Sequence, residues 1–227
     1  MNRKKTAMRI MKSKSTRSRF MNCISPIILC RIANYMGKRK LRVGFDLDGV
    51  LLYNPARIAR PLVSFIKRHI LKRKGTTFFI PQTPLHKLIW KFFHYSSLFV
   101  DPGVKHIKDL ISQNDIEAYI VSGRYGFLVD DFEKWLQKME TESYFKNALH
   151  NKDNQQPYLF KQKVIKDLDL DVFIEDNWDI VQKLQGSRTK IFWLYNIFDR
   201  GLPYQYKFAT LTKALKYIKK NLSEKLF

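Results

Sequence analysis

Two carboxylates two residues apart are the feature of this sequence most suggestive of chemistry. Asp46 and Asp48 lie within the apolar stretch 41–52 and are followed by Gly49. An apolar run that ends in polar residues and a glycine is typical of a buried strand, and residues i and i+2 of a strand point the same way. Carboxylates held so close repel each other unless a cation or a shared proton lies between them. The pattern predicts a magnesium site at the end of a strand.

The Asp-Leu-Asp-Gly sequence could also belong to a calcium-binding loop or to a turn without function. A calcium-binding loop that starts at Asp46 needs glycine at its sixth position and glutamate at its twelfth. Those positions hold Leu51 and Arg57, so a calcium loop is disfavoured. A turn without function also favours aspartate and glycine, and this stretch alone does not separate such a turn from a metal site.

The positive charge is concentrated in the first hundred residues. The 227-residue chain is 45% hydrophobic and carries a net charge of +22, which predicts one folded domain with room for an insertion or a tail. Residues 1–45 contain 13 Lys or Arg and no acid, residues 49–100 contain nine more and no acid, and residues 101–227 contain 20 basic and 18 acidic residues. This asymmetry predicts a basic surface for an anionic partner. The two cysteines, Cys23 and Cys30, are too few for a disulfide framework or a zinc site, which favours a cytoplasmic protein.

Residues 1–38 are predicted to form a basic arm that is partly disordered or lies at an interface. A basic region precedes the moderately apolar part of this arm, so a signal peptide is conceivable, but Asn22, Pro26 and Arg31 interrupt the apolar core. No stretch reaches the length of a spanning helix, and an interfacial amphipathic segment or a helix packed on the domain fits better. We expect residues 1–40 to contact an acidic membrane surface or nucleic acid, which would place a cytoplasmic protein peripherally at a membrane. No protein partner is predicted.

The segment that follows the paired aspartates is predicted to be helical. Apolar spacing predicts one helix over 56–74, closed by Gly75, and a second from Pro84 to about Phe99, with Thr83 as its N-cap. The second helix is unusually aromatic. Its apolar face could pack on the first helix, form a wall of a substrate site or touch a membrane, and the sequence leaves these alternatives open.

From Asp101 onwards, helical and strand patterns alternate. We expect helices over 104–114, 127–139, 160–168, 178–185 and 209–222, strands over 118–121, 172–174 and 190–195, a loop over 147–157 and a plain connection over 196–203. Such alternation predicts an α/β fold with a parallel sheet. Ser122-Gly123-Arg124 and Glu175-Asp176-Asn177 follow two of these strands, so they reach the same edge of the sheet as Asp46.

Four of these segments together resemble a known family. In chain order, residues 45–50, 121–124, 160–161 and 173–177 resemble the four motifs of the haloacid dehalogenase (HAD)-like phosphatase superfamily, over about residues 41–200. The resemblance implies a three-layer Rossmann-like parallel sheet built from residues 39–52 and 101–227, with a small helical cap inserted at 53–100. It also implies a hydrolase that releases phosphate from a nucleotide or sugar phosphate through an aspartyl-phosphate. The Ser-Gly-Arg and Glu-Asp-Asn sequences resemble the nucleotidase-like branches.

The resemblance also implies roles for single residues. Asp46 would be the nucleophile, and Asp48 would first protonate the leaving group and then activate water. Ser122 would hydrogen-bond the transferred phosphoryl group. Lys161 would offset the charge of Asp46 and the phosphate, with Lys163 as the second candidate for this role.

The same resemblance implies a Mg²⁺ ion. Its protein ligands would be Asp46, the backbone carbonyl of Asp48, and Asp176, with Glu175 as an outer partner. Which of Glu175 and Asp176 binds the ion directly remains open at this point, and two carboxylates that only cap the next helix are the structural alternative.

The substrate is expected to meet further groups. Gly49 and Gly123 would offer backbone contacts to the phosphate, and Arg124 would bind it or another anionic group, with a surface salt bridge as the alternative for Arg124. Basic residues of the inserted segment could reach an anionic substrate: Arg57, Arg60, Lys67, His86 and Lys87. A kinase is disfavoured because the chain lacks a Gly-x-x-x-x-Gly-Lys-Ser/Thr loop. The rival hypothesis is a catalytically idle protein that binds nucleic acid or an acidic membrane through its arm and cap.

Overall fold

The computed structural model describes residues 39–55, 78–95 and 97–224. The predicted basic arm, 1–38, and the predicted helix 56–74 lie outside the described residues. The part that is described contains the four predicted motifs and the second half of the predicted cap.

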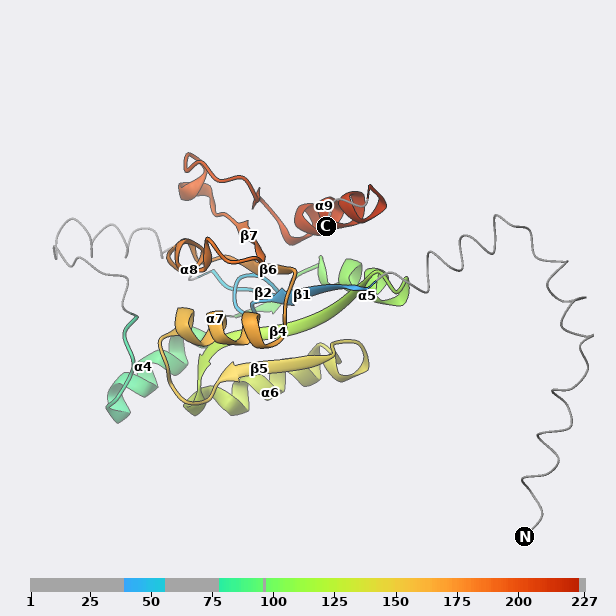
Figure 1. Cartoon of the computed structure of the whole chain (residues 1–227). Helices are drawn as coiled ribbons and strands as arrows, with labels where there is room; N and C mark the ends of the chain where they lie inside the picture. Colours follow the sequence, from blue (N-terminus) through green and yellow to red (C-terminus); the bar gives the residue numbers. More distant parts are fainter. Residues whose placement is uncertain (1–38, 56–77, 96, 225–227) are drawn as a thin grey trace, which may run out of the picture. The chain divides into compact units, whose positions relative to one another are not determined.

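A parallel sheet of six strands forms the centre of the molecule, within one compact unit that spans Lys40–Phe227 (Figure 1). The strand order is β5-β4-β1-β6-β7-β8, and every pair of neighbours is parallel. The strands are β1 (Leu41–Phe45), β4 (Ile116–Tyr125), β5 (Asn147–Asn151), β6 (Val172–Glu175), β7 (Lys190–Leu194) and β8 (Lys207–Phe208). The predicted α/β class with a parallel sheet is confirmed.

Helices cover both faces of this sheet. One face packs against α5 (Val104–Ser112), α6 (Val129–Lys138) and α9 (Leu211–Ser223). The other packs against α7 (Pro157–Asp167) and α8 (Trp178–Leu184). Three short 3₁₀ turns, Gly126–Leu128, Thr141–Ser143 and Ile197–Asp199, join these elements. The result is the predicted three-layer arrangement.

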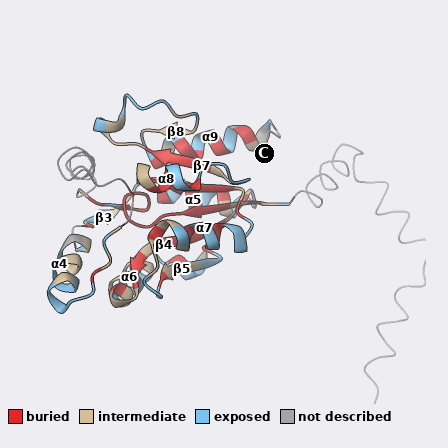
Figure 2. Ribbon diagram, turned by 60° about the vertical axis from the view of Figure 1, so that its left-hand side comes forward, coloured by how far each residue is buried: buried red, intermediate tan, exposed pale blue. Residues whose placement is uncertain are grey.

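The central strands are apolar on both sides because both sides are buried (Figure 2). In β4, Ala118 and Ile120 point into the core beneath α5 and α9, whereas Tyr119 and Val121 point into the core beneath α7 and α8. Strands covered on both faces read as continuous apolar runs rather than alternating ones. Because the strands are buried, their ends have defined positions, and so do the polar residues that follow them.

The inserted segment joins the core through a short antiparallel pair. Strand β2 (Leu52–Tyr53) pairs with β3 (Phe99–Val100), and helix α4 (Pro84–His94) lies between them in the chain. Thr83 caps this helix by accepting a hydrogen bond from the backbone N–H of His86 at 3.2 Å. The prediction that the helix continues to Phe99 was wrong, because Phe99 and its neighbour pair with β2 instead.

Several predicted boundaries differ from the structure. The predicted loop 147–157 was wrong, since Asn147–Asn151 form the edge strand β5. Helix α7 begins at Pro157, a residue that favours the first turn of a helix, rather than at residue 160. The connection 196–203 contains a 3₁₀ turn and is followed by the unpredicted strand β8. The remaining helices begin and end within about two residues of the predicted positions.

One boundary bears on the site. Strand β4 runs to Tyr125, so Ser122-Gly123-Arg124 lie within its last residues and not in a loop after it. The register with β5 shifts between Ser122 and Tyr125.

In the described parts of the chain, no helix combines the length and the apolar character needed to cross a membrane.

Candidate active site

Asp46 is buried at the tip of β1, where it contacts β6 and α7. Its backbone N–H donates to the carbonyl of Ile174 in β6 at 3.0 Å, and its Oδ1 accepts from the N–H of Leu47 at 2.9 Å. The Nζ of Lys161, on α7, is 3.0 Å from the Oδ2 of Asp46. Lys161 is buried, whereas Lys163 is exposed. Of the two candidate lysines, Lys161 is therefore the one beside Asp46.

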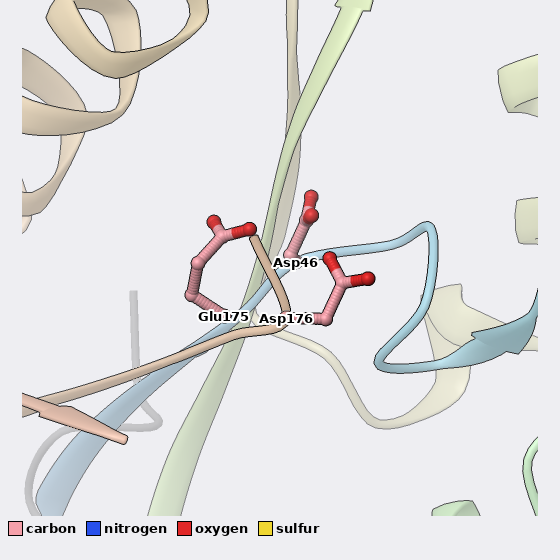
Figure 3. Close-up of side chains that lie close together, drawn as sticks. All are labelled: Asp46, Glu175 and Asp176. Atoms are coloured by element: carbon pink, nitrogen blue, oxygen red, sulfur yellow. The ribbon is translucent and has the colours of Figure 1, made fainter. Parts of the chain in front are cut away.

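Three buried carboxylates meet at the tips of β1 and β6 (Figure 3). Asp46, Glu175 and Asp176 each offer an oxygen, and these three oxygens lie within 4.8 Å of one another. Both oxygens of Glu175 have protein partners, because Oε2 accepts from Lys161 Nζ at 2.6 Å and Oε1 accepts from the N–H of Asn177 at 3.0 Å. This arrangement favours Asp176 over Glu175 as a direct metal ligand.

Gly49 allows Asp176 to lie against the turn after β1. Gly49 has φ of +86°, and a Cβ at this position would come within 2.2 Å of the Asp176 Oδ2. A side chain here would be strained and would also displace the carboxylate. Glycine is therefore required at position 49, where the turn after Asp46 and Asp48 lies against Asp176 at the tip of β6.

Negative charge exceeds positive charge in this cluster. Burial raises the pKa of Asp46 well above its usual value; Lys161 opposes this rise, and the carboxylates of Glu175 and Asp176 add to it. Among the described residues, the ammonium group of Lys161 contacts two of these three carboxylates, Asp46 and Glu175. The atoms that the three side chains offer to a metal ion are all carboxylate oxygens, which are hard ligands. A divalent cation with oxygen preference would restore the balance, so the residues present fit Mg²⁺.

Asp48, two residues after Asp46, is paired with an arginine. Its carboxylate forms a two-pronged ion pair with Arg124, Nε to Oδ2 at 2.8 Å and Nη2 to Oδ1 at 2.7 Å. The hydroxyl of Ser97 donates to Oδ1 at 2.9 Å, and the Nδ1 of His94 lies 3.5 Å from Oδ2. Burial alone would raise the pKa of Asp48, but Arg124, with a smaller contribution from His94, holds it well below the usual value.

Arg124 does not lie at the surface, where one alternative from the sequence placed it. Its side chain is 0% exposed and bridges Asp48 and Asp131, with Nη1 2.5 Å from the Asp131 Oδ2. The surface salt bridge was therefore the wrong alternative. Its three nitrogens all contact carboxylates, so the structure shows a buried link between β4 and α6 where the sequence predicted a phosphate ligand.

Ser122 and Gly123 lie at the point where β4 meets α7. Ser122 is fully buried, and its Oγ accepts from the N–H of Arg124 at 3.3 Å. A Cβ on Gly123 would stand 3.2 Å from Pro157 and 3.7 Å from the Cε of Lys161. The absence of a side chain at Gly123 lets α7 approach closely enough for Lys161 to reach Asp46.

The residues that tie the inserted segment to Asp48 were not predicted. The Nδ2 of Asn54 donates to the Ser97 Oγ at 3.3 Å, and Ser97 donates in turn to Asp48. Asn54 and Ser97 stand at the two ends of the insertion. One signal was present for His94, which shares a row of α4 with His86 and Trp90 at four-residue spacing; no such signal marked Ser97.

The comparisons with known proteins bear on the fold. No protein-family model and no curated protein sequence matches the chain. The solved structure of the HAD hydrolase YfnB from Bacillus subtilis, bound to magnesium, is 12% identical, covers 80% of this chain and 99% of its own, and superposes with a TM-score of 0.51. The chain has the haloacid dehalogenase-like fold.

Two more solved structures share the HAD-like fold. A haloacid dehalogenase-like hydrolase from Bacteroides fragilis is 13% identical, with a TM-score of 0.50 over 77% of this chain and 99% of its own. CbbY from Rhodobacter sphaeroides, in complex with phosphate, is 12% identical, with a TM-score of 0.50 over 78% and 100%. The predicted resemblance is confirmed at the level of the fold.

Proposed function

We propose that this protein is a Mg²⁺-dependent phosphomonoester hydrolase that works through an aspartyl-phosphate on Asp46. The observation that carries the proposal is the position of Asp46, which is buried beside Lys161 and shares a cluster with Glu175 and Asp176. Proteins with the same fold include a hydrolase solved with magnesium and a protein, CbbY, solved in complex with phosphate. A carboxylate next to a cation and a metal-binding cluster is suited to attack an anionic phosphate.

In the first step, a carboxylate oxygen of Asp46 attacks phosphorus and the bond from phosphorus to the leaving oxygen breaks. The leaving oxygen takes a proton from Asp48. Lys161 offsets the negative charge that collects on Asp46 and the phosphoryl oxygens, and Ser122 and the Gly123 backbone stand at the end of the adjacent strand to orient the group. Mg²⁺, when bound by Asp46 and Asp176, with the Asp48 carbonyl as the predicted third ligand, supplies positive charge that reduces the repulsion between carboxylate and phosphate.

In the second step, water attacks the phosphorus of the aspartyl-phosphate. The water proton goes to Asp48, the bond between phosphorus and the Asp46 oxygen breaks, and inorganic phosphate leaves with Asp46 restored as a carboxylate. The ion pair with Arg124 lowers the pKa of Asp48, which favours the deprotonated form that this second role needs. For the first role, Asp48 must gain a proton, so its contacts with Arg124 must loosen before the leaving group departs.

A phosphate-release assay tests the proposal. Wild type, Asp46→Asn and Asp130→Asn are compared on nucleotides, sugar phosphates and an aryl phosphate, each with Mg²⁺ and with a chelator. Asp130 is an exposed acid on α6 and serves as the control. We expect Asp46→Asn to abolish release and Asp130→Asn to leave it unchanged. Full magnesium-dependent activity in Asp46→Asn, or no activity of wild type on any substrate, would contradict the proposal.

We also infer that the protein associates with acidic membranes, because α4, much of which is coloured as exposed in Figure 2, carries apolar side chains that are open to solvent. Leu85, Leu88 and Phe92 are 64%, 65% and 76% exposed. The same helix carries Lys87 and Lys91 and no acidic residue. Apolar and basic side chains on one helix suit the interface of an anionic bilayer. This role is compatible with catalysis; if the substrate panel gave no activity, it would stand as the alternative to it.

A further inference from the structure

A cavity of about 740 Å³ lies between the inserted segment and the ends of two core strands. Its walls come from residues 80–82 and helix α4 on one side, and from the segments that follow β4 and β5 on the other. It is large enough for a small organic molecule. None of the catalytic residues proposed above lines it.

The cavity lies at the ends of β4 and β5, and β4 is the neighbour of β1, the strand that Asp46 follows. His150, which lines it, is the register partner of Ser122 on the neighbouring strand, and neighbouring strands are about 4.8 Å apart. A substrate that extends about 10 Å from a phosphoryl group at Asp46, across β4, would reach the cavity beside His150.

The charge of the walls favours an anion. Of the ten described residues that line the cavity, none is acidic, whereas Lys87 and Lys152 are basic. Lys87 belongs to α4 and Lys152 to the segment after β5, so the two ammonium groups come from opposite sides. Burial lowers the pKa of His150, which leaves the lysines as the source of positive charge at neutral pH. Two lysines without an acidic neighbour on the cavity wall suit a phosphate group.

The same cavity offers an aromatic wall. Phe127 lines the cavity, and its ring centroid is 6.0 Å from that of Tyr125, with an angle of 26° between the two ring planes. The ring centroid of Tyr125 is 6.4 Å from that of Trp90, and the Trp90 centroid is 6.5 Å from that of His94, which lies beside Asp48. A row of rings therefore runs from the contact with Asp48 to the cavity. Planar ligand rings stack on such surfaces.

Two side-chain amides complete the lining. Asn154 and Gln82 both face the cavity, and Asn154 is held in place because its Oδ1 accepts from the N–H of Gly126 at 3.0 Å. Carboxamides pair well with the hydrogen-bonding edge of a nucleobase. Lysines, a ring and amides are the combination expected for a nucleotide.

We propose that this cavity binds the leaving group of the substrate, and that the leaving group is a nucleoside bearing a second phosphate. The proposal rests on the proposed function for the chemistry at Asp46, but the cavity can be tested apart from that chemistry. Substrates of this class have one phosphate at Asp46, a base on the Phe127 wall and the second phosphate between Lys87 and Lys152.

The test compares kcat/KM for adenosine 3′,5′-bisphosphate, adenosine monophosphates, fructose 1,6-bisphosphate and p-nitrophenyl phosphate. We expect the nucleoside bisphosphate to exceed the other three by at least about tenfold, the worth of one well-placed charged contact. Lys152→Met should remove that advantage, and Phe127→Leu should lower kcat/KM for both adenosine compounds more than for fructose 1,6-bisphosphate, which has no planar ring to stack. Lys163→Met, an exposed lysine outside the cavity, is the matched control and should change nothing.

Calorimetric binding of adenosine 3′,5′-bisphosphate to the same variants separates the two proposals. Tight binding that Lys152→Met weakens tenfold, without hydrolysis of any substrate, would support the cavity and refute the hydrolase. Hydrolysis of p-nitrophenyl phosphate with no preference for the nucleoside bisphosphate would support the hydrolase and overturn the cavity assignment. Equal rates with the sugar bisphosphate, or equal losses on all substrates in Phe127→Leu, would overturn it as well.

Discussion

At the scale of single residues, the site depends on how the charges of its buried carboxylates are balanced. Asp46, Glu175 and Asp176 are buried together, and Lys161 is the cation that contacts two of them. Burial alone would lower the pKa of Lys161, but Asp46 and Glu175 raise it, so the ammonium group stays charged. Removing it would leave buried carboxylates without their partner.

Lys161→Met and Lys163→Met form a matched pair on one helix. We expect Lys161→Met to lower the free energy of unfolding by about 3 kcal/mol, the cost of breaking a buried ion pair, and to abolish phosphate release. Lys163→Met should stay within about 0.5 kcal/mol of wild type, as exposed substitutions do, and keep its activity. Denaturant unfolding and the phosphate assay measure both effects. Equal behaviour of the two variants would refute the assignment of Lys161.

Arg124 has an effect on stability that depends on pH. In wild type, the lowered pKa of Asp48 contributes stability that is present above the unfolded pKa, about 4, and is lost as the pH falls through the still lower folded pKa. In Arg124→Met, burial without the arginine would raise the folded pKa of Asp48 above the unfolded one. The charged carboxylate then destabilises the folded state at neutral pH.

We therefore expect Arg124→Met to be less stable than wild type by about 3 kcal/mol or more at pH 7, with the deficit shrinking as the pH falls toward about 4. Urea unfolding of both proteins across this pH range measures it. Arg188→Met, an exposed arginine whose ion pair with Asp169 spans 3.8 Å, is the control and should differ little at any pH. A deficit for Arg124→Met that stayed constant with pH would show that Asp48 is not the group responsible.

At the scale of elements, the turn after β1 tests the metal site. Gly49 and Gly186 both have positive φ, +86° and +82°, but a Cβ on Gly49 would meet Asp176 whereas one on Gly186 would meet nothing within 4 Å. We expect alanine at either position to cost about 1 kcal/mol of stability from backbone strain. Only Gly49→Ala should also weaken Mg²⁺ binding, by tenfold or more, in calorimetric titration. Equal Mg²⁺ affinity in the two variants would remove Asp176 from the ligand set.

Elements with strong local signals were predictable from the sequence. The apolar run before Asp46 and the one before Glu175 mark β1 and β6, because central strands are buried on both faces. The edge strand β5 escaped prediction since Asn147–Asn151 are largely polar and only half-buried for most of their length. Helix α4 ends earlier than its apolar pattern indicated, and Phe99 belongs to β3, which pairs with β2. The spacing of apolar residues cannot show to which of two neighbouring elements such a residue belongs.

The candidate site was predictable in its residue types but not in its pairings. The four motifs indicated Asp46, Lys161 and Asp176, and the fold brings them together. The side chain of Arg124 turns toward Asp48 and Asp131 instead of outward. Asp48 is 76 positions away in the sequence, and a contact over that separation leaves no local pattern. Ser97 and His94 have the same limitation, since their significance arises only when the inserted segment returns to the core.

At the scale of the whole molecule, charge is divided along the chain. Residues 1–45 carry 13 basic residues and no acid, and the exposed apolar side chains of α4 lie in the described part of the insertion. We expect the full chain to co-sediment with vesicles that contain acidic lipid, and to release them steeply as salt rises.

A double variant, Leu88→Glu with Phe92→Glu, should reduce this co-sedimentation at least tenfold while phosphate release from p-nitrophenyl phosphate stays unchanged. Leu159→Glu, which alters a 47% exposed leucine on α7, is the control and should bind vesicles as wild type does. Binding that persists in the double variant, or salt-sensitive binding to RNA or DNA but not to vesicles, would contradict a membrane surface at α4.

The most direct test of Asp46 as the nucleophile is to trap the phosphorylated enzyme. Wild type is mixed with substrate and Mg²⁺, quenched in acid within one turnover, reduced with borohydride and digested for peptide mass spectrometry. An aspartyl-phosphate is reduced to homoserine, so we predict homoserine at position 46 in wild type and none in Asp46→Asn. Turnover of substrate without this modification at residue 46, or with it at another aspartate, would contradict catalysis through Asp46.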